Sequence, residues 1–138
     1  MSFLLDTNVV SEWVKPQPNA GLMRWTDSVD EDSAFLSVIT LAELRHGIDR
    51  MVKSKRRRRL EAWLHDELPI RFEGRILSID PSVADACGRM IRRAKLLGRP
   101  IEAMDAFLAA TAEIHDLTLV TRNVSDFPLL KTIVNPWT

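Results

Sequence analysis

The stretch Met1-Ser-Phe-Leu-Leu-Asp6-Thr-Asn8 decides how the rest of the chain is interpreted. Phe3, Leu4 and Leu5 form an apolar run that is too short for a buried helix, and it predicts a strand covered on both faces. Asp6 follows at once, so its carboxylate lies where the strand leaves the core. Ligands of open α/β sheets bind at the carboxyl ends of the strands. Asp6 is therefore a candidate site residue, and a helix N-cap is the alternative interpretation.

The size and composition of the chain predict one globular domain over residues 1–138. The 138 residues are 46% hydrophobic, and a chain of this length buries roughly two-thirds of its unfolded surface. No apolar run approaches the roughly 20 residues of a membrane span, and no signal peptide is evident. Cys87 is the only cysteine, so no disulfide can form within the chain. We expect a cytoplasmic protein that does not bind a membrane.

The net charge of zero hides three regions of different sign. Residues 1–52 carry a net charge of −4, residues 53–99 a net charge of +7, and residues 100–138 a net charge of −3. This pattern favours a protein that binds cations at one place and a polyanion beside it. The basic middle opens with Arg56, Arg57, Arg58 and Arg59.

Strand and helix patterns alternate along the chain. Further strands are predicted at residues 34–37, 76–79 and 117–121, with a short edge strand at 133–134. Asp80 followed by Pro81 predicts the start of a helix that ends near Leu97. A basic helix is expected to stop at Pro69. The fold class is therefore α/β, a three-layer α/β/α sandwich with a mostly parallel central sheet.

Four acids occupy comparable places in this fold. Asp6 follows the first strand, Glu43 opens the helix after the second, Asp105 lies in the helix before the fourth, and Asp126 lies after the fourth. Thr40-Leu-Ala-Glu43 also matches a capping box, which is a structural explanation for Glu43. Converging carboxylates repel by about 4 kcal/mol per pair at 4 Å and an effective dielectric near 20, so they need a cation. Oxygen ligands favour Mg²⁺ or Mn²⁺, which can activate water at a phosphodiester.

Four motifs, in this order and spacing, resemble those of PIN-domain ribonucleases, and in particular the VapC/FitB toxins of type II toxin–antitoxin pairs. The motifs are Leu4-Leu-Asp6-Thr-Asn8-Val-Val-Ser-Glu12, Ser37-Val-Ile-Thr-Leu-Ala-Glu43-Leu-Arg-His-Gly47, Asp105-Ala-Phe-Leu-Ala-Ala-Thr-Ala112 and Leu119-Val-Thr-Arg-Asn123-Val-Ser-Asp126-Phe127. The resemblance extends from Met1 to Trp137.

The resemblance implies a PIN-like fold, a Mg²⁺- or Mn²⁺-dependent endoribonuclease, a homodimer and an antitoxin that blocks the site. It makes Asp6 and Asp105 the principal metal ligands, Glu43 the second acid and Asp126 the fourth. Some members of the family carry the fourth acid where this chain has Asn123. The side chains expected to orient carboxylates or waters are those of Thr7, Asn8, Thr121 and Asn123.

The basic run and two rival functions also have to be considered. The basic run Arg56–Arg59 is expected to contact RNA or an acidic surface of the antitoxin. A catalytically inactive PIN-type interaction module is the alternative function, and the four acids argue against it. A phosphatase of the haloacid-dehalogenase type, which needs a second acid two residues after the first, is disfavoured because Asn8 stands at that position.

Overall fold

Five short apolar stretches form one parallel sheet with the strand order β3-β2-β1-β4-β5. The computed structural model, which describes residues 1–138, gives the bounds of the strands. They are β1 Phe3–Leu5, β2 Ala34–Ser37, β3 Ile76–Leu77, β4 Thr118–Val120 and β5 Ile133–Val134.

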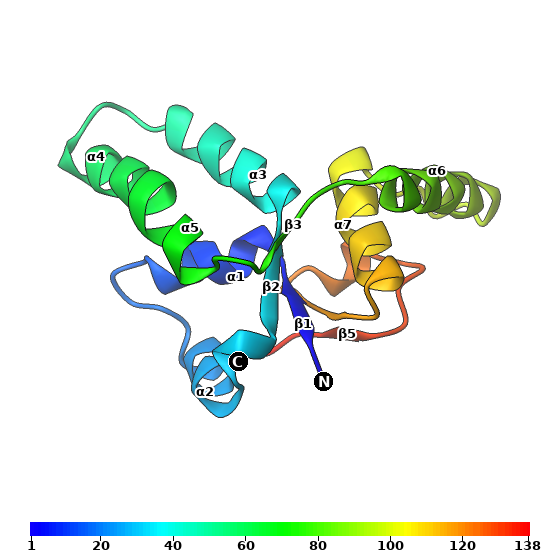
Figure 1. Ribbon diagram of the computed structural model, residues 1–138, viewed down its shortest axis with the longest axis horizontal. Coiled ribbons are helices and arrows are strands. Elements are labelled where there is room, and N and C mark those ends of the chain that lie inside the picture. The colour runs from blue at the N-terminus through cyan, green and yellow to red at the C-terminus, as the bar shows by residue number, and fades with distance from the viewer.

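Helices cover both faces of this sheet because the side chains of a strand alternate in direction. Phe3 and Leu5 of β1 pack in one apolar cluster, and Leu4 packs in another on the opposite face. Figure 1 shows α1 to α5 on one side and α6 and α7 on the other. Their bounds are α1 Thr7–Trp13, α2 Ala20–Ser28, α3 Val38–Asp49, α4 Lys55–Ala62, α5 Leu68–Arg71, α6 Pro81–Leu96 and α7 Ala103–Ile114. Two short 3-10 helices, η1 Glu31–Ser33 and η3 Val124–Asp126, and a π-helical segment, η2 Trp63–Glu67, complete the secondary structure.

The predicted α/β/α sandwich with a parallel sheet is confirmed. The strands at 34–37 and 133–134 have the predicted bounds, whereas β3 and β4 are shorter than expected. Asp80 caps α6, as predicted, by accepting a hydrogen bond from the Val83 N–H at 2.9 Å. The helix ends at Leu96, and Gly98 adopts a φ of 68°, a left-handed conformation that glycine tolerates best.

Two predicted helix boundaries were wrong. The helix after β2 begins at Val38, and its cap is Ser37, whose hydroxyl accepts the Ile39 N–H at 3.0 Å. The Thr40–Glu43 capping box therefore does not form. The basic helix also does not stop at Pro69, because the π-helical turn η2 shifts the hydrogen-bond register just before that proline.

The strand order creates one topological switch point, between β1 and β4. From β1 the chain moves outward through β2 and β3, and then returns to the other side of β1 for β4 and β5. The Asp6 N–H donates to the Val120 carbonyl at 2.9 Å, which ties the carboxyl ends of β1 and β4 together. A ligand crevice is expected at this place.

None of the helices combines the length and the hydrophobicity that a membrane span requires.

Candidate active site

Asp6 lies at the centre of the switch point and is held by three neighbours. Its Oδ1 accepts the Thr7 N–H at 2.7 Å. Its Oδ2 accepts the Thr121 hydroxyl at 2.7 Å and the Asn8 side-chain amide at 3.3 Å. Asp6 is thus both the N-cap of α1 and a buried carboxylate with 7% of its surface exposed, so the two interpretations of this residue hold together.

The polar residues around Asp6 form a connected network. The Asn8 side-chain amide also donates to the Thr121 hydroxyl at 3.3 Å, and Asn8 Oδ1 accepts the Arg122 backbone N–H at 3.3 Å. Asn123 contributes its backbone N–H, which donates to the Thr121 hydroxyl at 3.0 Å. The network fixes the loop after β4 against the start of α1.

Glu43 reaches the same place from α3. Its Oε1 accepts the Thr7 hydroxyl at 2.7 Å, so Thr7 joins the carboxyl ends of β1 and β2. Burial raises the pKa of Glu43, and the negative charges of Asp6 and Glu102 add to that rise. Because the capping box is absent, this carboxylate faces the other acids and not its own helix terminus.

Asp105 completes the group from the first turn of α7. Burial raises its pKa to about 7, together with the charges of Asp6, Glu102, Asp126 and Glu43. No hydrogen bond offsets this rise. Deprotonating Asp105 therefore adds a negative charge to a place that already holds several.

The charge of Asp126 also acts on Asp6. Burial raises the pKa of Asp6, and the charge of Asp126, which is exposed in η3, contributes to that rise against the hydrogen bonds from Thr121 and Thr7. Asp126 therefore lies within electrostatic range of both Asp6 and Asp105. The charges of the other three acids expected from the sequence, Asp6, Glu43 and Asp126, all act on Asp105 at the carboxyl edge of the sheet.

Glu102 is a fifth acid that the sequence reasoning missed. It is the N-cap of α7, and its carboxylate accepts the Asp105 N–H at 3.4 Å. Its charge raises the pKa of both Asp105 and Glu43. Its position three residues before Asp105 could have revealed it. An acid at the N-cap lies at the same end of a helix as a residue in the first turn.

The donor set fits a hard divalent cation. It consists of carboxylate oxygens, and none of these five acids forms an ion pair with a lysine or arginine. The carboxylates are close enough to affect one another's pKa, although no three of them are already arranged as a ligand cluster. A cation that draws them together would relieve their mutual repulsion.

The predicted basic run lies apart from this group, at the start of α4, and its members differ. Arg57 is held inside the α3–α4 hairpin: it donates to Glu61 Oε1 and to the Met51 carbonyl, both at 2.8 Å. The neighbouring residues Arg56, Arg58 and Arg59 are exposed.

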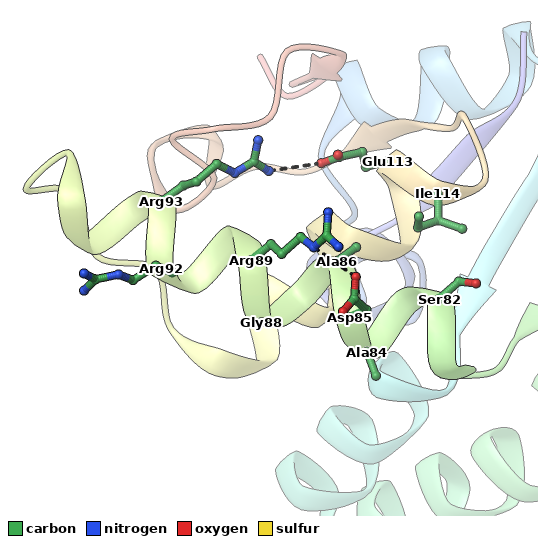
Figure 2. A pocket seen from close by; sticks show the side chains of 10 residues that line it. All are labelled: Ser82, Ala84, Asp85, Ala86, Gly88, Arg89, Arg92, Arg93, Glu113 and Ile114. Atoms are coloured by element: carbon green, nitrogen blue, oxygen red, sulfur yellow. Dashed lines mark ion pairs between the residues drawn. The ribbon is translucent and has the colours of Figure 1, made fainter.

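The largest cavity is remote from the acids. It has a volume of about 1110 Å³ and lies along α6 and the end of α7. Figure 2 shows its charged residues: Asp85 pairs with Arg89 at 3.0 Å, Glu113 pairs with Arg93 at 3.7 Å, and Arg92 points away from Glu113. Its acids are paired, so it lacks the uncompensated charge found at the switch point.

Comparison with known proteins identifies similar chains. The profile of the PIN domain family matches residues 3–128. Toxin FitB of Neisseria gonorrhoeae is 41% identical over 135 residues, which are 97% of each protein. The VapC ribonuclease Y4jK of Sinorhizobium fredii is 36% identical over 135 residues, 97% of this chain and 96% of that protein. The crystal structure of FitAcB from Neisseria gonorrhoeae superposes with a TM-score of 0.91 at 40% identity, covering 98% of both chains.

Proposed function

The chain belongs to the PIN-domain family, and from this premise we propose that it is the toxin of a toxin–antitoxin pair, an endoribonuclease that hydrolyses RNA phosphodiester bonds. The similarity to toxin FitB and to a VapC ribonuclease over almost the whole chain supports both parts of the proposal. The observation that carries it is the convergence of Asp6, Glu43, Asp105 and Asp126 at the switch point without a paired cation.

We propose that these four carboxylates hold Mg²⁺ or Mn²⁺. When bound, the ion supplies a Lewis acid that polarises a phosphoryl oxygen and makes water more acidic at neutral pH. Asp6 and Asp105 are the principal ligands in this proposal, because one is buried at the centre of the network and the other has the most unfavourable charge environment. We assign the role of the fourth acid to Asp126 and not to the position of Asn123. The negative charge of Asp126 raises the pKa of both Asp6 and Asp105.

The neutral residues orient this group. Thr121 and Asn8 both donate to Asp6 Oδ2, and the Thr7 N–H donates to Oδ1. The Thr7 hydroxyl holds Glu43 from the other side. These hydrogen bonds favour the ionised carboxylates against burial, which is the state that binds a cation. They also fix the positions of the carboxylates, so substrate binding requires less rearrangement.

The partners follow from the same family membership. We propose a cognate antitoxin that blocks the carboxylate site, a homodimer of the chain, and action on cytoplasmic RNA. One domain over residues 1–138 carries the whole activity in this proposal.

The test is an RNA digestion with the purified chain, freed of any bound antitoxin. We expect cleavage with Mg²⁺ or Mn²⁺, none with EDTA, and a much lower rate with the variant Asp105→Asn. Cleavage that persists in EDTA would contradict the role of the metal. A folded chain that does not cut RNA under any of these conditions would favour the inactive interaction module.

A further inference from the structure

A groove runs from the carboxylate cluster along the face of α4. Figure 1 shows α1, α3 and α4 on the same side of the sheet. Between them lies a cavity of about 320 Å³, which has Thr7 and Glu43 at one end and Arg56, Leu60 and Trp63 at the other. One end of the groove therefore reaches Glu43, one of the four proposed metal ligands.

The groove continues outward beyond Arg56. A second cavity of about 420 Å³ shares Arg56, Leu60 and Trp63 with the first, and adds Arg59 and Glu67. Because Arg56, Leu60 and Trp63 line both cavities, the two adjoin along α4 and are described together as one channel. It begins at the carboxylates, passes along an apolar wall and ends at the surface of α4.

Arg56 and Arg59 both line the second cavity, which Glu67 also lines. Residues three apart on a helix lie on the same face, and this spacing places Arg56 and Arg59 along one side of the groove. Neither forms an ion pair within the chain, whereas Arg57 between them pairs with Glu61 at 2.8 Å and Asp49 at 3.5 Å. The basic run therefore divides into a structural arginine, Arg57, and three exposed arginines, of which Arg56 and Arg59 line the channel.

We propose that this groove binds the RNA strand on one side of the bond that is cut, with Arg56 and Arg59 contacting its phosphates and Leu60 and Trp63 contacting its bases. The inference rests on the proposed function and assigns the substrate path for it. A strand cut at the carboxylates must continue away from them, and this groove opens directly at Glu43. Cations beside an aromatic and apolar wall are the usual means of binding single strands without base pairing.

The test measures RNA binding separately from cleavage. The full chain carrying Asp105→Asn is titrated into a fluorescent single-stranded RNA at several salt concentrations, and anisotropy gives the dissociation constant. Adding Arg56→Gln or Arg59→Gln should each weaken binding by about threefold to tenfold and reduce the slope of log affinity against log salt by about 0.7, as expected for one lost phosphate contact. Trp63→Phe keeps an aromatic ring of smaller area and should weaken binding less.

Arg24→Gln is the matched control, because Arg24 is exposed on α2 and its loss changes the net charge equally. We expect this variant to bind RNA like the parent. Arg56→Gln and Arg59→Gln variants that bind no more weakly than Arg24→Gln would overturn the inference. So would a loss of binding to the co-expressed antitoxin with RNA affinity unchanged, because the groove would then belong to a protein partner.

The cleavage assay of the unmodified chain separates this inference from the function on which it rests. If that chain cuts RNA and the two arginine variants bind it normally, only the groove assignment fails. If that chain neither binds nor cuts RNA, the proposed function fails and the groove assignment fails with it.

Discussion

The two ends of the parallel sheet treat charge in opposite ways. At the carboxyl end, Asp6, Glu43 and Asp105 converge without a lysine or arginine, and their pKa values are raised by burial and by one another. At the amino end, Arg75 precedes β3 and donates to the carbonyls of Glu31 and Ala34, both at 2.6 Å. One end gathers carboxylates that have no ion pair, whereas at the other end Glu31 is paired with Arg71 and Arg75.

The arginines of the amino end also pack against aromatic rings. Arg71 donates to Glu31 Oε1 at 2.6 Å and lies 4.4 Å above the ring centroid of Trp13, and Arg75 lies 4.7 Å above that of Phe72. These contacts fasten α5 to the start of β2. The contrast indicates that paired charge stabilises the fold here, and that unpaired charge marks the place where a ligand completes the pairing.

The largest effect is expected from Asp105→Asn at the carboxyl end. Removing this carboxylate should lower the rate of RNA cleavage by about 10²–10³-fold, the range found when one strong electrostatic contribution to a transition state is lost. The fold should survive, because the wild-type carboxylate receives no hydrogen bond and its ionisation opposes burial. A gel assay of RNA cleavage and a thermal unfolding curve measure the two quantities.

Asp27→Asn controls for the loss of an exposed acid, since Asp27 lies on α2 away from the switch point. We expect its cleavage rate to match that of the wild type. An Asp105→Asn protein that cuts RNA at the wild-type rate would show that the unpaired charge at the carboxyl end has no catalytic role.

Arg75→Ala at the amino end should have the opposite profile. The substitution removes the guanidinium donor from the carbonyls of Glu31, Ala34 and Arg71, and it removes the cation above Phe72. We expect a loss of about 2–3 kcal/mol in the free energy of unfolding, measured with urea, and unchanged cleavage below the unfolding temperature. Arg75→Lys should recover only part of the loss, because an ammonium lacks the planar fork of donors. A full recovery would mean that charge alone, and not the hydrogen bonds, fastens this end.

The acids at the two ends of the sheet should change the stability of the chain in opposite directions as the pH rises. The folded chain binds the Asp105 proton more tightly than the unfolded chain does, because the folded pKa is about 7 against an ordinary value of 3.8. The free energy of unfolding therefore falls as the pH rises from about 4 to 7 in EDTA. Allowing for the partial exposure of this residue, the fall is about 1–2 kcal/mol.

This contribution is isolated by subtracting the unfolding curve of Asp105→Asn from that of the wild type at each pH. The subtraction also removes the contribution of Glu31 at the amino end, whose pKa is lowered chiefly by its hydrogen bond from Arg71 and which changes stability in the opposite direction. Adding Mn²⁺ at pH 8 should raise the free energy of unfolding of the wild type and leave that of Asp105→Asn unchanged. A pH-independent difference between the two proteins would contradict the charge repulsion described for the carboxyl end.

The sequence was sufficient to predict the acids that directly follow a strand. An apolar strand, a polar break and a helix place an acid at a sheet edge whatever the tertiary details, and Asp6 lies where this rule puts it. Glu43 was expected in the first turn of its helix because Thr40 resembles an N-cap. The helix begins earlier because β2 ends at Ser37, whose hydroxyl caps it at once, and Thr40 is buried instead with its hydroxyl unpaired.

The remaining features depend on how distant segments meet. Arg57 belongs to the same run as Arg56 and Arg59, and only the α3–α4 hairpin reveals that it is tied to the Met51 carbonyl. Glu102 resembles an ordinary helix cap in the sequence. Its place among the acids depends on the direction in which α7 points toward β1, which local patterns do not encode.

Glu102→Gln should produce the smallest effect, and it tests whether the carboxyl end has five participating acids or four. The charge of Glu102 raises the pKa of both Glu43 and Asp105, so removing it lowers the negative potential that attracts a cation without removing a proposed ligand. The attraction between the Glu102 carboxylate and the bound cation through water is about 1 kcal/mol. Its loss should lower the Mn²⁺ affinity roughly fivefold, which calorimetric titration measures. Cleavage at saturating Mn²⁺ should stay within about twofold of the wild type.

Glu102→Asp keeps both the charge and the ability to cap α7. It should therefore bind Mn²⁺ like the wild type, which would rule out a loss of affinity caused by fraying of the helix. Equal affinities in all three proteins would leave Glu102 as a helix cap alone, whereas a hundredfold loss of cleavage at saturating metal would make it a direct participant.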